Sequence, residues 1–256
     1  MSGISLQPKI IYGPIFSRRL GRSLGINLLP VKMKTCSFDC LYCQYNQTTD
    51  WTLSPDRDTL PAPDEVFEAV EKALKKPRSM DFLTFSGNGE PTIHPDFPEI
   101  VKGVRILLDQ YRPDAKLALL SNSTMVFSQA VQEAIRLIDA PMMKLDAGDE
   151  TTFQTINQPV KGLHFDEIMS GLRKIPHLMI QSVMVDGKVS NVSGEPYQAW
   201  KNALADLKPQ VIHIYSTERP TMREDVVRVN PKRLSEIAEE LQGDLQLNAE
   251  AFWHER

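Results

Sequence analysis

Cysteine is scarce in this sequence: its 256 residues contain three, and all of them fall within the eight residues from Cys36 to Cys43. A disulfide framework needs an even number of cysteines spread along the chain. Three cysteines this close together would leave one unpaired. The sequence therefore excludes a disulfide-stapled protein and raises the question of what needs three thiols and no fourth.

Other features are missing as well. No apolar run reaches the length of a membrane-spanning helix, and the first residues lack a basic segment followed by an apolar one. We therefore expect no membrane partner. Clustered thiols suit a reducing compartment, which predicts a cytoplasmic location. The formal net charge of −4 does not suggest a general nucleic-acid binder, so nucleic acid remains a weakly supported partner through a local basic patch.

Three alternatives account for the thiols. A structural zinc site needs four protein ligands, and the fourth would have to be a histidine, of which His94 is the nearest. Thiols that only pack as small apolar side chains would be scattered along the chain. A four-iron cluster has four corners, so three cysteines fill three of them and leave one iron open to a small molecule.

Short apolar runs alternate with amphipathic helical patterns along the chain. Strands are predicted at residues 24–30, 81–87, 115–122, 142–148, 178–187 and 210–217. Helices are predicted to follow them at residues 63–76, 95–111, 128–138, 164–175, 196–207 and 231–242. This order predicts an α/β fold with a parallel sheet covered by helices. A flavodoxin-like open sheet is the rival topology, and residues 245–253 add a last strand or a cap.

The spacing C-x3-C-x-aromatic-C, with Tyr42 as the aromatic residue, resembles the motif of the radical S-adenosylmethionine (SAM) enzymes. The resemblance implies that Cys36, Cys40 and Cys43 bind a [4Fe–4S] cluster and that SAM binds the fourth iron, with Tyr42 among the cofactor contacts. It implies that an electron from the cluster cleaves SAM to methionine and a 5′-deoxyadenosyl radical, which abstracts hydrogen from a substrate. Flavodoxin or ferredoxin is the kind of electron donor expected.

The predicted order of six strand–helix units is similar to the partial (β/α)6 TIM-like barrel of that family. The resemblance implies one domain over residues 1–256. Within it we expect an N-terminal extension, a βα core and a C-terminal cap, over residues 1–23, 24–242 and 243–256.

The second predicted strand ends in the sequence SGNGEPT, residues 86–92, where glycines allow a backbone to approach a ligand closely. Alone, this segment also fits a plain turn between a strand and a helix. It resembles the GGEP motif that binds the amino group of SAM, but Asn88 stands where the motif has its second glycine. The cofactor contacts implied here are Gly87, Asn88, Gly89, Glu90 and Pro91.

The third predicted strand ends in Ser121, Asn122 and Ser123. In the family, small polar residues at this place reach the ribose or carboxylate of SAM, so the resemblance implies that Ser121 and Asn122 bind the cofactor. Ser123 fits a helix cap at least as well.

Lys144 and Asp146 lie two residues apart in the fourth predicted strand and would share one face of it. A buried pair of opposite charges is costly unless matched, and such pairs often mark functional sites. We predict that both face the barrel interior and act in catalysis by placing SAM or an anionic substrate. A structural ion pair is the alternative. Weaker substrate candidates are Lys188, Asn191, Tyr215 and Arg219, and Arg18, Arg19 and Arg22 form the best local anion-binding candidate.

Beyond the superfamily, the segments GPIFSRRLGRSLGINLLP and VDGKVSN resemble an uncharacterised group of small Fe–S oxidoreductase-like proteins. That group is distantly similar to the wybutosine-synthesis tRNA enzymes, which carry a second cluster on additional cysteines. This chain has no cysteine for a second cluster. The substrate is unidentified, and the open alternatives are a tRNA-modifying enzyme, a glycyl-radical activase, and a non-enzymatic Fe–S electron carrier or sensor.

Overall fold

The computed structural model describes residues 4–45, 47–218, 221, 223 and 225–253. Its contacts divide the chain into two compact units. The N-terminal unit comprises Ser5–Ser37 and Thr48–Met142, and the C-terminal unit comprises Met1–Ile4, Phe38–Gln47 and Met143–Arg256. The predicted division of a single domain into extension, core and cap stays a prediction.

The N-terminal unit contains a sheet in the order β1-β2-β5-β6. Its strands are β1 (Ile11–Ser17), β2 (Gly21–Ile26), β5 (Phe82–Phe85) and β6 (Lys116–Ser121). The last three are parallel, with Leu24 opposite Leu83 and Phe85 opposite Leu119. β1 is antiparallel to β2. The short strands β3 (Thr35–Cys36) and β4 (Asp50–Trp51) form a separate parallel pair.

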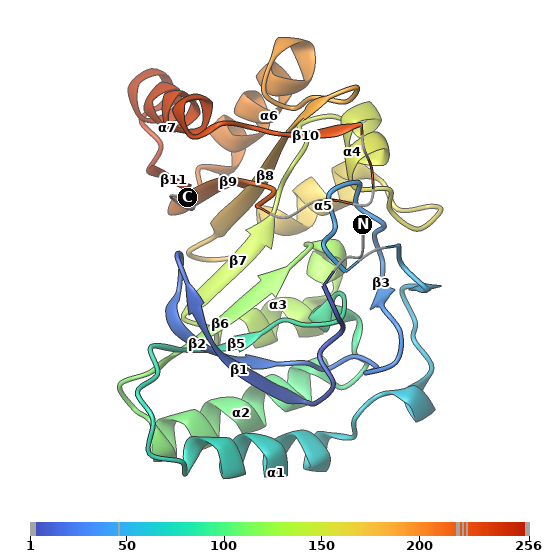
Figure 1. The fold of residues 1–256 in the computed structure, drawn as a ribbon, viewed down its shortest axis with the longest axis vertical. Helices are drawn as coiled ribbons and strands as arrows, with labels where there is room; N and C mark the ends of the chain where they lie inside the picture. The colour runs from blue at the N-terminus through green and yellow to red at the C-terminus, as the bar shows by residue number, and fades with distance from the viewer. Residues whose placement is uncertain (1–3, 46, 219–220, 222, 224, 254–256) are drawn as a thin grey trace. The chain divides into compact units, whose positions relative to one another are not determined.

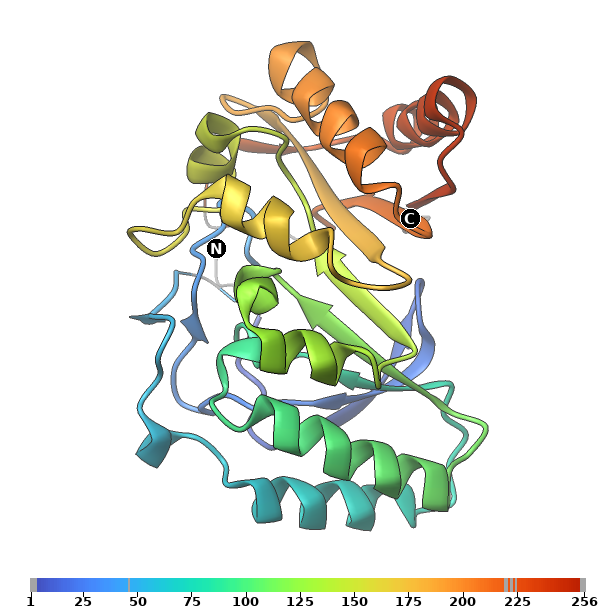
Figure 2. The ribbon, with the colours of Figure 1, turned by 180° about the vertical axis from the view of Figure 1, so that it is seen from behind.

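Helices cover the parallel strands of this unit. They are α1 (Pro63–Leu74), α2 (Phe97–Tyr111) and α3 (Gln129–Ile135), and α1 and α2 lie side by side (Figures 1 and 2). Proline at the first position of α1 and the Glu65 side chain, which accepts from the N–H of Ala62 at 2.8 Å, define where that helix begins. Short 3-10 helices η1 (Arg57–Thr59), η2 (Pro91–Ile93) and η3 (Thr124–Phe127) lie in the connections.

The strands of the C-terminal unit follow in the order β7-β8-β9-β11. They are β7 (Ala140–Lys144), through which the chain enters this unit, β8 (Met179–Gly187), β9 (Val211–Ser216) and β11 (Ala249–Phe252). β8, β9 and β11 are parallel, and β10 (Val226–Arg228) is antiparallel to β8. The helices are α4 (Glu150–Ile156), α5 (Phe165–Leu172), α6 (Gly194–Leu207) and α7 (Pro231–Leu245), with α7 next to β11 (Figure 1).

The six predicted strand–helix units are confirmed, with β2, β5, β6, β7, β8 and β9 each followed by at least one helix. Within each unit, successive parallel strands are neighbours, whereas a flavodoxin-like sheet would reverse its order. The prediction for residues 142–148 was too long, because β7 ends at Lys144 and Asp146 lies beyond it. β1, the 3-10 helices, β3, β4, β10 and α4 were not predicted, and residues 245–253 contain the strand β11.

Among the described residues, no helix combines the length and the apolar character needed to cross a membrane.

Candidate functional site

The cysteine loop follows β2 and the short strand β3. Cys36 is the last residue of β3 and is buried, whereas Cys40 and Cys43 are half-buried. The neighbouring residues Trp51 and Thr52 fix the start of the loop. The carbonyl of Cys36 accepts from the N–H of Thr52 at 3.1 Å, and that of Ser37 accepts from the Trp51 indole at 3.1 Å. After Ser37 the chain passes into the C-terminal unit.

The glycine loop after β5 lies directly against the residue that precedes Cys36. Gly89 has φ +151°, and a Cβ atom there would lie 1.7 Å from the carbonyl oxygen of Thr35. Thr35 and Gly89 form a parallel bridge, in which the N–H of Thr35 donates to the Asn88 carbonyl at 3.1 Å. Gly89 is therefore required for the close approach of two backbones. Gly87 has φ +137°, and a Cβ atom there would clash with the side chain of Asn27.

The amide of Asn88 joins three segments of the N-terminal unit. Its oxygen accepts from the N–H of Gln7 at 2.7 Å, and its nitrogen donates to the carbonyls of Gln7 at 3.0 Å and Pro30 at 2.9 Å. These bonds use both amide hydrogens, so this side chain has a structural role. Pro91, also buried, is the first residue of η2. That Gly87, Asn88, Gly89 and Pro91 contact the cofactor stays a prediction.

Glu90 connects the glycine loop to the end of β6. Its Oε1 atom accepts from the Thr92 N–H at 3.0 Å, from the Thr92 hydroxyl at 2.5 Å and from the Ser121 hydroxyl at 2.8 Å. Its Oε2 atom accepts from the N–H of Asn122 at 2.5 Å. Burial raises the pKa of Glu90, and these donors oppose the rise by stabilising the carboxylate. Glu90, Ser121 and Asn122, three predicted cofactor residues from two loops, thus form one network.

Asn122 extends this network to the first cysteine. Its Nδ2 atom lies 2.8 Å from the hydroxyl of Ser37 and 3.6 Å from Sγ of Cys36. Its Oδ1 atom accepts from the N–H of Thr124 at 2.9 Å and from the Thr124 hydroxyl at 2.5 Å. The predicted contact of Ser121 and Asn122 with SAM stays a prediction, whereas a contact between Asn122 and a cysteine sulfur was not foreseen.

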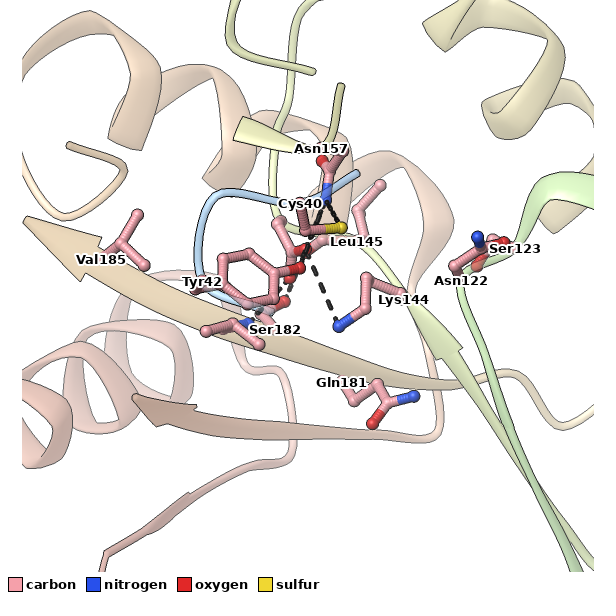
Figure 3. A network of polar contacts seen from close by, with 12 residues as sticks. Cys40, Tyr42, Asn122, Ser123, Lys144, Leu145, Asn157, Gln181, Ser182 and Val185 are labelled. Atoms are coloured by element: carbon pink, nitrogen blue, oxygen red, sulfur yellow. Dashed lines mark hydrogen bonds and ion pairs between the residues drawn. The ribbon is translucent and has the colours of Figure 1, made fainter. Parts of the chain in front are cut away.

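A second polar network surrounds Cys40 in the C-terminal unit (Figure 3). The hydroxyl of Tyr42 donates to Oδ2 of Asp146. The Nδ2 atom of Asn157 lies 2.7 Å from the same Asp146 oxygen, 3.3 Å from the Tyr42 hydroxyl and 3.6 Å from Sγ of Cys40. Burial, followed by the charge of Asp146, raises the pKa of Tyr42 well above its ordinary value, so its hydroxyl is a donor at neutral pH.

Lys144 and Asp146 both belong to this network. Nζ of Lys144 lies 3.8 Å from Oδ2 of Asp146 and 5.3 Å from the centre of the Tyr42 ring, in a cation–π geometry. The Asp146 side chain is fully buried and that of Lys144 is 14% exposed. Asp146 also accepts from the N–H of Val183 at 2.8 Å. The catalytic role of the two residues stays a prediction.

Asn157 is the residue that the sequence did not reveal, because it stands 117 positions after Cys40 and belongs to no local motif. Asn191 is a structural residue: its amide donates to the carbonyls of Asp146 at 2.8 Å and Val183 at 2.9 Å, and it accepts from the Val185 N–H at 2.8 Å. These bonds fix the segment that carries Asp146.

The remaining candidates are less informative. Arg22 pairs with Asp81 at 2.7 Å on the surface, so the predicted anion-binding group has one member already engaged by a carboxylate. The Tyr215 hydroxyl donates to Gln181 at 3.3 Å. Arg219 lies outside the described residues.

The donors around the thiols suit an iron–sulfur cluster. Burial raises the pKa of Cys40 to about 11, so without metal this thiol is neutral, and binding of iron would displace its proton. Within the part of the chain that the structure describes, no three His, Cys, Asp or Glu side chains converge on one metal ion. Three cysteines of a cluster bind three different irons, so convergence on one ion is not needed. Side-chain amides near two of the sulfurs provide the hydrogen bonds that cluster ligands commonly receive.

Comparison with known sequences gives relatives over most of the chain. The UPF0026 protein of Synechocystis sp. is 31% identical over 235 residues, which are 91% of this chain and 79% of that protein. The UPF0026 protein of Methanocaldococcus jannaschii is 37% identical over 165 residues, which are 64% of this chain and 48% of that protein. The chain thus spans about half the length of the latter relative.

Comparison with solved structures shows the fold. A radical SAM methyltransferase from Sphaerobacter thermophilus has a TM-score of 0.66 at 14% identity, over 91% of this chain and 67% of its own. TYW1 with a lysine-pyruvate adduct bound has a TM-score of 0.60 at 15% identity, over 86% of this chain and 73% of its own. The predicted partial TIM-like barrel is therefore confirmed, with its mostly parallel strands.

The model of the radical SAM superfamily matches residues 31–191. This range includes the cysteine loop, the glycine loop, and the two polar networks that contain Asn122 and Asn157. Members of that superfamily use a [4Fe–4S] cluster and SAM. The match covers more than half of the sequence, and the chain therefore belongs to the radical SAM superfamily of enzymes.

Proposed function

We propose that Cys36, Cys40 and Cys43 bind one [4Fe–4S] cluster and that the chain uses it with SAM to abstract hydrogen from a substrate. When bound, the cluster supplies the electron that cleaves SAM to methionine and a 5′-deoxyadenosyl radical. The observation that supports this proposal best is the Glu90 network, which connects the glycine loop and the end of β6, through Asn122, to Cys36 and Ser37. An electron carrier without a SAM site has no need of such a network.

The residues of this network are proposed to position the cofactor. Glu90 holds the backbone of Asn122 and the hydroxyl of Ser121, so the two loops keep a fixed relation within the N-terminal unit. Gly89 keeps the glycine loop against Thr35 and leaves space where a side chain would clash. A carboxylate already surrounded by donors is preorganised, which lowers the cost of ordering the loop when SAM binds.

Lys144 is the residue proposed to receive an anionic group of SAM or of the substrate. Its ammonium group lies 3.8 Å from the Asp146 carboxylate and over the face of the Tyr42 ring, in a largely buried position. TYW1 contains a lysine-pyruvate adduct in its solved structure. At 15% identity that likeness supports the fold alone, and the proposal for Lys144 rests on its own surroundings.

The test begins with anaerobic reconstitution with iron and sulfide. We expect about four irons per chain by the cluster stoichiometry, an EPR signal on reduction with dithionite, and 5′-deoxyadenosine when SAM is added. The control is a variant with all three cysteines changed to serine. Stoichiometric tetrahedral zinc in anaerobically purified protein, with no iron uptake, would contradict the cluster. A bound cluster that never cleaves SAM would favour the electron carrier or sensor.

The substrate is then sought with deuterated cell extract. Deuterium should appear in 5′-deoxyadenosine when a fraction contains the substrate. RNA, protein and small-molecule fractions are tested separately, which distinguishes a tRNA-modifying enzyme and a glycyl-radical activase from an enzyme of small molecules. A cytoplasmic location and reduction by flavodoxin or ferredoxin complete the proposal, and both follow from the reducing conditions that such a cluster requires.

A further inference from the structure

We propose that the side-chain amides of Asn122 and Asn157 donate N–H···S hydrogen bonds to Cys36 and Cys40 and thereby raise the reduction potential of the cluster. This inference rests on the proposed function, since it concerns sulfur atoms that would bind iron. The two asparagines belong to different units of the chain, and each approaches the cysteine of its own unit.

The orientation of the Asn122 amide is fixed by its oxygen. Oδ1 accepts two hydrogen bonds from Thr124, one from the backbone N–H and one from the hydroxyl. A backbone N–H can only donate, so the group facing it must be the oxygen. The nitrogen then points to Ser37 and to Sγ of Cys36, at 2.8 and 3.6 Å. Both of its hydrogens have an acceptor, and one of those acceptors is sulfur.

The orientation of the Asn157 amide is fixed by its nitrogen. Nδ2 lies 2.7 Å from the carboxylate of Asp146, which is an acceptor when ionised. One amide hydrogen therefore goes to Asp146. The other is directed between the Tyr42 hydroxyl oxygen at 3.3 Å and Sγ of Cys40 at 3.6 Å. Tyr42 donates its own proton to Asp146, so its oxygen competes with the sulfur only as an acceptor.

Both amides lie where they have a large electrostatic effect. Asn122 is 8% exposed and Asn157 is 2% exposed, so water screens neither of them effectively. Reduction of an iron–sulfur cluster adds negative charge that spreads onto its sulfur ligands. A donor directed at a ligand stabilises the reduced form more than the oxidised form, and hydrogen bonds to the sulfurs are among the factors that set cluster potentials.

The first experiment needs no variant. The protein is produced with asparagine labelled with ¹⁵N at the side-chain amide, loaded with cluster, reduced, and studied by pulsed EPR. We expect hyperfine coupling between the cluster spin and the labelled amide nitrogens. Asn122→Leu and Asn157→Leu should each remove one contribution. Asn230→Leu and Asn248→Leu are matched controls, because each removes a side-chain amide that binds backbone and belongs to neither network, and they should remove none.

The second experiment measures the midpoint potential of the cluster by redox titration. The potential should shift to more negative values in Asn122→Leu and in Asn157→Leu, and by about the sum of the two shifts in the double variant, since separate sites add. The two controls should keep the parent potential. A parent protein that takes up no iron contradicts the proposed function. A loaded protein without the ¹⁵N coupling, or with unchanged potentials in both variants, overturns this inference alone.

Discussion

At the scale of single residues, Asp146 and Lys144 have different surroundings although they form one pair. The Asp146 carboxylate accepts from Tyr42, Asn157 and Val183 and has no exposed side-chain surface. Lys144 retains 14% exposure of its side chain. A buried carboxylate without its donors would be strongly destabilised, whereas the lysine has a route to ligand or solvent. Asp146 thus holds Tyr42 and Asn157 by hydrogen bonds, and Lys144 stays the proposed contact with a ligand.

This difference predicts an order of effects. Asp146→Asn places an amide against several donors, so we expect it to lose about 3–5 kcal/mol of stability, as does a broken buried ion pair. Lys144→Met leaves the other donors to Asp146 in place and should cost less. Lys144→Met should bind a full cluster and yet lose SAM cleavage or hydrogen abstraction. Denaturant unfolding and 5′-deoxyadenosine formation measure the two properties. Normal turnover by Lys144→Met would show that the pair is only structural.

Glu90 gives a second prediction at this scale. Glu90→Gln replaces one carboxylate oxygen by an NH2 group, which leaves a buried donor such as the Asn122 N–H without an acceptor. The expected loss is about 1–3 kcal/mol of unfolding free energy. The affinity for SAM should fall as well, because Asn122 and Ser121 lose their fixed positions. Equilibrium dialysis with labelled SAM measures this, with Ser121→Ala as a milder control. Reduced stability with unchanged SAM affinity would make Glu90 a loop anchor only.

At the scale of elements, the regular βα units were predictable and the irregular segments were not. The apolar runs of β5 and β6 are mostly buried, and a buried parallel strand leaves a clear pattern in the sequence. β1 has four exposed residues in succession and includes Gly13 and Pro14, so it lacks that pattern. α4 has only seven residues, three of them threonine, and its start is fixed by the Asp149 side chain, which accepts from Thr152.

In the candidate site, the contiguous motifs were predictable and the residues from distant segments were not. The cysteines and the glycine loop form contiguous motifs, and their chemistry is visible in the sequence. Asn157 and Asn191 approach the site from distant segments, and only the folded chain brings them there. The prediction that Lys144 and Asp146 share one face assumed that both lie in one continuous strand. In the structure, β7 ends at Lys144. The two side chains meet because Asn191 holds the backbone carbonyl of Asp146 and the N–H of Val183 holds its carboxylate.

The glycine loop supplies a prediction for an element. Gly89→Ala places a methyl group against the carbonyl of Thr35, at a φ that side chains rarely adopt. We expect the loop to move away from Thr35, with a loss of about 1–3 kcal/mol in stability and weaker SAM binding. Gly243→Ala is the matched control, because it lies in α7 with open space around it, and it should be neutral or stabilising. If the two variants had equal stability and equal affinity for SAM, the close approach of Gly89 to Thr35 would be contradicted.

At the scale of the whole molecule, stability should depend on pH through His94. Burial lowers the pKa of His94 from its ordinary value of 6.5, and its Nδ1 accepts from the N–H of Asp96. The unfolded chain therefore takes up a proton near pH 6.5 while the folded chain does so only at lower pH, and stability falls as the pH drops through that window. His94→Gln should lose this component. Unfolding measured at several pH values tests it, and parallel curves for the two proteins would contradict it.

Iron binding gives the last prediction for the molecule as a whole. The cysteines are buried or half-buried, and burial raises the pKa of Cys40 to about 11, so the metal-free loop holds at least one neutral thiol. A cluster binds the folded loop with its neighbours in place and binds the unfolded chain weakly, so its binding free energy adds to folding. Even a hundredfold excess over the dissociation constant corresponds to about 2.7 kcal/mol, or roughly 5–10 °C in unfolding temperature for a chain of this size. Anaerobic removal of iron with a chelator should lower the unfolding temperature of the loaded protein by at least this amount. The triple cysteine-to-serine variant should unfold at the same temperature with and without iron. If the loaded and chelated forms of the parent unfold together, the cysteines do not bind a cluster that stabilises the fold.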